Sequence, residues 1–223
     1  METLSLDWET RSVVDLRDCG AYIYAEHPST SIVCLGYHLP GFEDVRIWRP
    51  LDGDTFPAEV LDWTAAGKPV RAWNATFERL IWNAVLTRSI QNAPVMAIEQ
   101  TYCTMTESLA MALPGRLSLA AKVLGLEQRK DDAGGRVMKQ ISKPRAPRKN
   151  ENPVEILWWE DPEKNQQVYD YCKQDVRTEL AAAKKIRRLD HSEQRMYWLD
   201  QHINDRGIFI DVRNTFFVFK GRS

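Results

Sequence analysis

The chain has 223 residues, with 30 basic against 31 acidic side chains and a formal net charge of -1. This length suits one domain or slightly more and is enough to bury a sizeable core. A hydrophobic fraction of 43% and a charged fraction of 27% are typical of soluble globular proteins. We expect no membrane helix, since no apolar run approaches about 20 residues, and no signal peptide, since residues 1–10 are acidic. The charge balance excludes a wholly basic nucleic-acid binder but allows a local basic patch.

The cysteines are scattered and form no Cys-x-x-Cys pair. They are Cys19, Cys34, Cys103 and Cys172. This distribution argues against a disulfide scaffold or a zinc ribbon, and it is typical of a reducing compartment.

The first predicted elements are strands. Residues 4–9 form a short apolar run that predicts a buried strand, and residues 31–39 and 45–48 predict two more. A Pro-Gly-Phe-Glu turn joins the last two. We expect these three strands to form an antiparallel meander.

Strands and helices then alternate. Residues 57–66 predict a short helix that begins at Pro57, residues 70–73 a fourth strand, and residues 75–86 a helix. Such alternation predicts an α/β sheet.

From Thr104 onward the pattern is mainly helical. We expect breaks at Pro114-Gly115, at Gly125 and at Gly134-Gly135. A long helix is predicted over 162–189 and a second over 192–205, with a last strand at 207–211.

Basic side chains concentrate between residues 116 and 149, a segment that contains ten Lys and Arg residues and three acidic residues. The end of this segment, SKPRAPRKNENP, is rich in proline and charge and predicts a mobile loop. The segment is our candidate for phosphate contacts with a nucleic-acid strand, through Arg136, Lys139 and Lys143. A solvated loop without such contacts is the alternative.

Asp7 and Glu9 stand two residues apart at the end of the first predicted strand. Side chains at i and i+2 of a strand share one face, so these carboxylates are neighbours. Two close carboxylates repel each other unless a positive charge lies between them. A divalent cation such as Mg²⁺ or Mn²⁺ meets this need, whereas the alternative is a pair of surface acids. Trp8 points to the opposite face and is expected in the core.

A second acidic site follows the fourth strand. Asn74 is placed to cap the next helix, and Glu78 lies in its first turn, where the helix dipole favours negative charge. Helix capping alone explains this segment. A third site lies in the long helix, where the i,i+4 spacing puts Tyr171 and Asp175 on one face. As an isolated pair, these two could equally form a structural hydrogen bond.

Taken in order, these D-x-E, N-x-x-x-E and Y-x-x-x-D sites resemble the motifs of the DnaQ-like (DEDD) 3′→5′ exonucleases, in the Tyr-bearing DEDDy branch. The resemblance implies an α/β fold of the ribonuclease H-like class, with a mixed central β-sheet flanked by helices. One position departs from the family pattern, because the second motif usually supplies Asp and here supplies Glu78.

Two further stretches resemble the proofreading module of phage-type family A DNA polymerases. They are residues 113–126 (LPGRLSLAAKVLGL) and 204–211 (NDRGIFID), of which the second resembles the entry into the polymerase part. Twelve residues follow Asp211, and they do not continue the family pattern. We therefore expect an exonuclease domain at 1–190, and at 191–223 a helix and tail that resemble the truncated start of a polymerase domain.

The resemblance also implies a mechanism, namely hydrolysis of phosphodiester bonds at the 3′ end of single-stranded DNA with two divalent cations. Asp7 would contact both ions, Glu9 and Asp175 would complete one ion site, and Glu78 would serve the other. Tyr171 would orient the attacking water, since a free phenol with a pKa of about 10 is a poor base.

Other implied features concern the substrate and its setting. Thr10 would contact the terminal nucleotide, and Asn74 would shape the second motif. A separate DNA polymerase subunit is the implied partner, no membrane is involved, and the expected compartment is the cytoplasm of a bacterial or phage-infected cell.

Two rival interpretations remain open at this point. An RNase D-like 3′ exoribonuclease would share the DEDDy motifs, although the polymerase-like stretches favour DNA. A non-catalytic accessory module of a polymerase would bind nucleic acid without cutting it.

Overall fold

A computed structural model describes residues 2–126, 132–152 and 154–210. Asp211 and the tail therefore lie outside the described residues, as do Arg129, Lys130 and their neighbours in the basic segment. The elements follow one another as β1 (Leu4–Arg11), α1 (Leu16–Glu26), β2 (Ser31–His38), β3 (Arg46–Trp48), η1 (Pro50–Asp52), α2 (Ala58–Ala65), β4 (Val70–Ala72), α3 (Ala75–Ile81), η2 (Trp82–Leu86), α4 (Thr87–Ser89), η3 (Ile98–Gln100), β5 (Thr101–Cys103), α5 (Thr104–Ala110), α6 (Leu117–Val123), α7 (Asp132–Ile141), α8 (Pro162–Ala183) and α9 (His191–Arg206).

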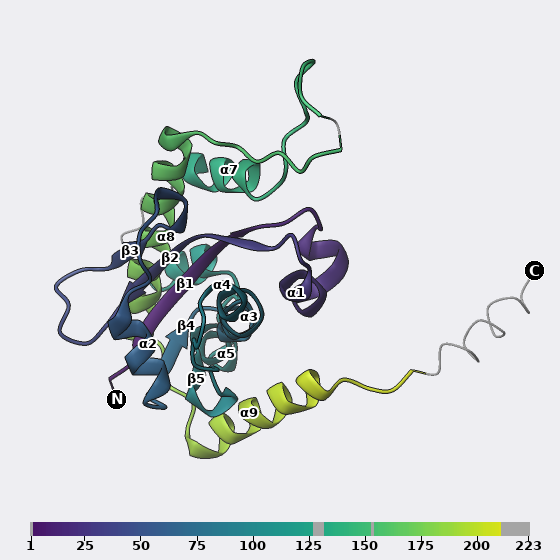
Figure 1. Ribbon diagram of the computed structural model, residues 1–223. Coiled ribbons are helices and arrows are strands. Elements are labelled where there is room, and N and C mark those ends of the chain that lie inside the picture. The colour runs from purple at the N-terminus through teal and green to yellow at the C-terminus, as the bar shows by residue number, and fades with distance from the viewer. Residues whose placement is uncertain (1, 127–131, 153, 211–223) are drawn as a thin grey trace, which may run out of the picture.

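The strands form one mixed five-stranded sheet in the order β3-β2-β1-β4-β5. β1, β2 and β3 pair antiparallel, as the expected meander requires, while β1 pairs parallel with β4 and β4 with β5. Helices α7 and α8 lie on one side of β1 and β2, and α3 and α4 lie on the other (Figure 1). The mixed α/β class predicted from the sequence is confirmed.

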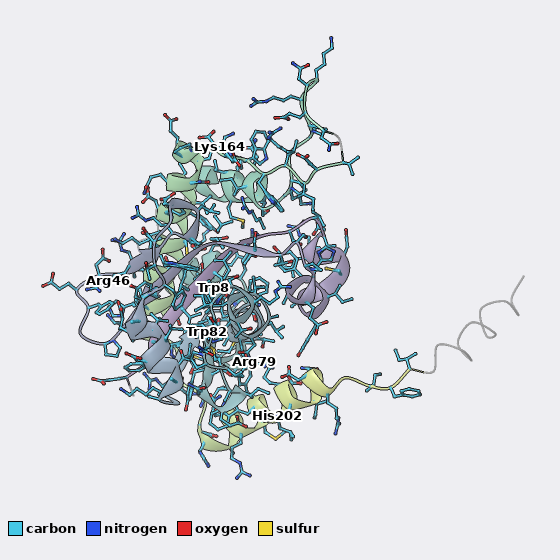
Figure 2. The ribbon with its side chains drawn as sticks, in the orientation of Figure 1. Trp8, Arg46, Arg79, Trp82, Lys164 and His202 are labelled. Atoms are coloured by element: carbon cyan, nitrogen blue, oxygen red, sulfur yellow. The ribbon has the colours of Figure 1, made fainter. Side chains whose placement is uncertain are left out.

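Alternation along β1 separates a hydrophobic face from an acidic one. Leu4, Leu6 and Trp8 point into the main core, and Trp8 is only 3% exposed. The Trp8 ring lies 6.2 Å from the ring of Trp82 in η2 (Figure 2), so its predicted core position is confirmed. Asp7 and Glu9 consequently face the side of the sheet that carries α8.

α8 lies against the sheet at Gly36 of β2, which stands opposite Asp7 in the β1–β2 register. A Cβ atom at Gly36 would lie 2.9 Å from both Cys172 Sγ and Val176 Cγ2 of α8. Only glycine leaves room for this approach. The absence of a side chain at Gly36 therefore brings the middle of α8 next to the acidic end of β1.

The predicted break at Gly134-Gly135 is wrong, because α7 runs through both glycines. Glycine costs a helix about 1 kcal/mol relative to alanine. Val137, Met138 and Ile141 of α7 pack into a second core cluster with α8, and this packing outweighs the weak intrinsic propensity.

The helix α1, the strand β5 and the short 3₁₀ turns η1 and η3 were not predicted, and the described residues 207–210 do not form the strand predicted at 207–211. α1 contains Gly20 with a non-helical φ of 76°, which interrupts its helical period, and β5 has only three residues. The described part of the strand expected at 207–211 is irregular, because the exposed side chains of residues 208–210 find no neighbouring strand.

The predicted helix at 75–86 is also interrupted. It divides into α3, the π-helical turn η2 and the short α4. The helix predicted over 162–189 ends at Ala183, earlier than expected.

α9 packs against the rest of the described chain through Tyr197 and Trp198, which contact the main core, and through polar contacts. Arg79 of α3 forms an ion pair with Asp205 at 2.7 Å, and the Trp198 indole N–H donates to the Thr101 carbonyl at 2.9 Å. Arg79 and His202 mark the α3 and α9 sides of this region in Figure 2. The division into domains at residue 190 stays a prediction. Within the described ranges, no helix combines the length and apolar character needed to cross a membrane.

Substituting Gly36 by alanine should destabilise the protein by about 1–3 kcal/mol, because the added methyl overpacks the β2–α8 contact. Gly135→Ala is the matched control, since its Cβ would meet the Tyr171 ring at an ordinary 3.8 Å. We expect Gly135→Ala to stabilise the helix by about 0.5–1 kcal/mol. Urea unfolding followed by circular dichroism measures both, and equal stability of the two variants would contradict the close approach.

Candidate active site

A cavity of about 630 Å³ opens at the carboxyl end of β1. Its walls are formed by β1, by the helices α3, α7 and α8, and by the segment that leads into α1. The five side chains expected to carry the chemistry all line it, and these are Asp7, Glu9, Glu78, Tyr171 and Asp175. Three segments that are far apart in the sequence thus meet at one place.

Asp7 and Glu9 form the acidic floor of this cavity. Burial, and next the charge of Asp175, raises the pKa of Asp7 well above its ordinary value. Burial, and next the charge of Asp7, does the same to the pKa of Glu9, which is 7% exposed. These acids are therefore not the pair of surface acids that remained possible from the sequence.

Glu78 reaches the site from the first turn of α3 and is held by Trp8. The Trp8 backbone N–H donates to Glu78 Oε2 at 3.0 Å, and the Trp8 indole N–H donates to the Glu78 carbonyl at 3.2 Å. In the parallel ladder between β1 and β4, the paired residues of β1 are Leu4 and Ser5. Trp8 lies beyond this pairing, so its N–H is available to the Glu78 carboxylate. Burial, and next Asp7, raises the pKa of Glu78, and the hydrogen bond from Trp8 partly offsets this rise.

The expected side-chain cap at Asn74 is wrong. Asn74 occupies the N-cap position of α3 but makes no side-chain capping bond. Its ψ of 74° departs from the extended conformation usual at this position. Glu78 is 5% exposed and bonded to β1, so capping alone no longer explains this segment.

Tyr171 and Asp175 project from one face of α8 into the cavity. The Tyr171 hydroxyl lies near Asp175, whose charge acts on it. Burial, and then the charges of Asp175 and Glu9, raises the pKa of Tyr171 far above its usual value. The phenol therefore stays protonated at neutral pH, which suits a group that orients a reactant and not one that removes a proton.

The predicted nucleic-acid contacts divide into two groups. Thr10, Lys139 and Lys143 line the cavity. Arg136 is exposed on α7, and neither it nor Asn74 lines the cavity.

Polar contacts hold two of these lining residues in place. The Thr10 hydroxyl lies 3.0 Å from the Tyr24 hydroxyl. Lys143 Nζ pairs with Asp15 Oδ2 at 2.5 Å, across the mouth between α7 and the start of α1.

The cavity wall built by the start of α1 was not predicted from the sequence. Asp15 caps this helix by accepting from the Arg17 N–H at 2.9 Å, and Leu16 lines the cavity beside it. An Asp before a helical segment is a recognisable start signal, but Gly20 obscured the helix that follows it. Cys172 was also missed, and its ligating atom lies within 4.8 Å of those of Asp7 and Glu9.

The donor set fits a hard divalent cation. Carboxylate oxygens are the preferred ligands of Mg²⁺ and related ions. Burial first, and then the charge of the neighbouring carboxylates, raises the pKa of Asp7, Glu9 and Glu78. A bound cation would remove the repulsion between these charges.

Comparison with known proteins gives one close similarity. No model of a known protein family matches this sequence. A DNA polymerase of Bacillus phage SP02 is 39% identical over 219 residues, which is 95% of this chain. The chain spans about a third (32%) of the length of that polymerase. The chain is thus similar to part of a phage DNA polymerase, which is consistent with a polymerase-derived module.

Proposed function

We propose that this chain is a metal-dependent 3′→5′ exonuclease that hydrolyses single-stranded DNA from its 3′ end, with a ribonuclease H-like fold of the DEDDy type. The convergence of Asp7, Glu9, Glu78, Tyr171 and Asp175 on one cavity is the observation that carries the proposal. The similarity to a phage DNA polymerase supports DNA as the polymer.

Asp7, Glu9 and Asp175, with Glu78 at the α3 side, would hold two Mg²⁺ or Mn²⁺ ions. Such ions, when bound, neutralise charge on the scissile phosphate and lower the pKa of water. The chain's own contribution is to keep the carboxylates close together in spite of their repulsion. The Trp8 N–H engages one oxygen of Glu78 and so fixes the carboxylate that comes from α3.

Tyr171 supplies a protonated hydroxyl beside Asp175, placed to orient a water for attack. Apolar side chains of Leu16, Phe77 and Met138 line the same cavity and offer a surface to the terminal nucleotide. Lys139 and Lys143 add positive charge for phosphate groups of the entering strand.

A DNA polymerase is the partner that best fits this activity, because the chain resembles about a third of one. In that arrangement the module would remove nucleotides from a 3′ end during DNA replication, either as a separate subunit or as part of a longer protein.

Digestion of a 5′-labelled single-stranded DNA oligonucleotide tests the proposal. We expect a ladder that shortens from the 3′ end with Mg²⁺ or Mn²⁺ and stops with a chelator. A matched RNA oligonucleotide should be cut more slowly, whereas preferential cutting of RNA would indicate an exoribonuclease. Binding without any cleavage would indicate a non-catalytic module.

Tyr171→Phe should lower the rate about 10²–10⁴-fold while the protein still folds, since only the water-orienting hydroxyl is lost. Tyr169→Phe is the matched control. Tyr169 lies on the same helix and its hydroxyl donates to Asp52 at 3.2 Å, away from the cavity. Single-turnover digestion measures both variants, and an unchanged rate for Tyr171→Phe would make Tyr171 a structural residue.

Asp7→Asn should stabilise the metal-free protein and abolish cleavage. Because the folded state raises the pKa of Asp7, ionising this group costs stability as pH rises above its unfolded value of about 3.9. The gain from Asn should therefore be small near pH 4 and should increase toward pH 8. Asp170→Asn, at an exposed acid of α8, is the control and should change little. Thermal unfolding in chelator measures the effect, and a loss of stability at pH 8 would contradict it.

Lys139→Gln with Lys143→Gln should weaken binding of a long single strand. The log–log salt slope should fall by up to about 1.4, at about 0.7 per lost phosphate contact. A control with the same charge change combines Arg148→Gln and Lys149→Gln, both at exposed positions that do not line the cavity. Affinities are measured on an Asp7→Ala background at several salt concentrations. Equal losses in the two double variants would show that the cavity wall is not the strand path.

A further inference from the structure

Cys172 lies in α8 directly after Tyr171, on the side that faces the sheet. Its side chain is fully buried, with 0% exposure. The Sγ atom lies 3.4 Å from the Asp7 carbonyl oxygen and 3.6 Å from Asp7 Oδ2, and the thiol donates toward both. The thiol therefore contacts the acid on which the proposed chemistry depends most.

The surroundings of Cys172 hold its thiol in place. Gly36 lies so close that a Cβ there would be 2.9 Å from Sγ and 3.3 Å from the Cys172 carbonyl. Cys34, which stands opposite Glu9 in the β1–β2 register, is a second buried thiol in the same core cluster as Cys172. In such close packing a side chain has few alternative rotamers, so the donor stays directed at Asp7.

We propose that Cys172 is a positioning residue for Asp7, whose thiol fixes the orientation in which the Asp7 carboxylate faces the cavity. The inference rests on the proposed function, because Asp7 is the carboxylate expected to contact both ions. A thiol is a weak donor, and the effect lies in direction more than in strength. Metal ligands must be held within about 0.5 Å and 10–20° of their productive geometry.

Groups that orient a metal ligand have a recognisable effect when removed. Their loss typically weakens metal affinity or activity about 10–100-fold. A residue that only fills space has a different effect, because its loss lowers stability and leaves the metal dependence of the folded protein unchanged.

The test compares Cys172→Ala, which removes the donor, with Cys172→Ser, which keeps one. Val176→Ala is the packing control, since Val176 lies one turn further along α8, is 1% exposed and would be, like Cys172, 2.9 Å from a Cβ at Gly36. Two quantities are measured well below each melting temperature: Mn²⁺ affinity by calorimetry without DNA, and the Mg²⁺ concentration that gives half-maximal cleavage.

We expect Cys172→Ala to weaken Mn²⁺ binding and to raise the half-maximal Mg²⁺ concentration by about 10-fold or more. Cys172→Ser should recover most of this loss, and Val176→Ala should be less stable with wild-type metal dependence. Wild-type Mn²⁺ affinity in Cys172→Ala, a Ser variant no better than Ala, or an equal loss in Val176→Ala would overturn the inference. A wild-type protein that binds Mn²⁺ but cuts no DNA would instead refute the proposed function, and the Mn²⁺ affinities would still decide the role of Cys172.

Discussion

The approach of α8 to β2 at Gly36 is the constraint on which the site depends. A side chain at this position would separate the helix from the sheet, because it would meet Cys172 and Val176 at 2.9 Å. With glycine at this position, α8 lies close enough to the sheet for Cys172 to contact Asp7. Tyr171 and Asp175 of the same helix then reach the cavity. One missing Cβ thus sets the distance between the carboxylates of β1 and those of α8.

A buried polar network fixes the same helix further along. Glu179 of α8 accepts from the Thr104 hydroxyl, and Arg71 of β4 donates to Thr104 at 3.2 Å and pairs with Glu107 at 2.5 Å. These four residues are each no more than 3% exposed. A buried ion pair is weak evidence for stability, but its loss would leave an uncompensated charge. This network joins α8 to β4 and α5 and so helps to keep α8 in its position at Gly36.

Much of this arrangement could be predicted from local patterns. The alternation of side chains along the first strand correctly predicted that Trp8 lies in the core and that Asp7 lies on the opposite face, because a strand has a fixed period of two. Two local predictions failed: the glycines inside α7 are tolerated through packing against α8, and Asn74 makes no capping bond, while Glu78 of the same segment is held by the distant Trp8. Cys172 gave no signal, since its role arises only from a helix–strand contact between distant segments.

The crowded carboxylates pose an energetic conflict that a bound cation would relieve. Burial and mutual repulsion raise the pKa values of Asp7 and Glu9, a cost that a folded protein bears most readily where a functional charge is to be bound. Crystals soaked in Mn²⁺ and measured for anomalous scattering test this directly. We expect a peak within coordination distance of Asp7 and of Glu9 or Asp175. A cavity without an anomalous peak at saturating Mn²⁺ would contradict it.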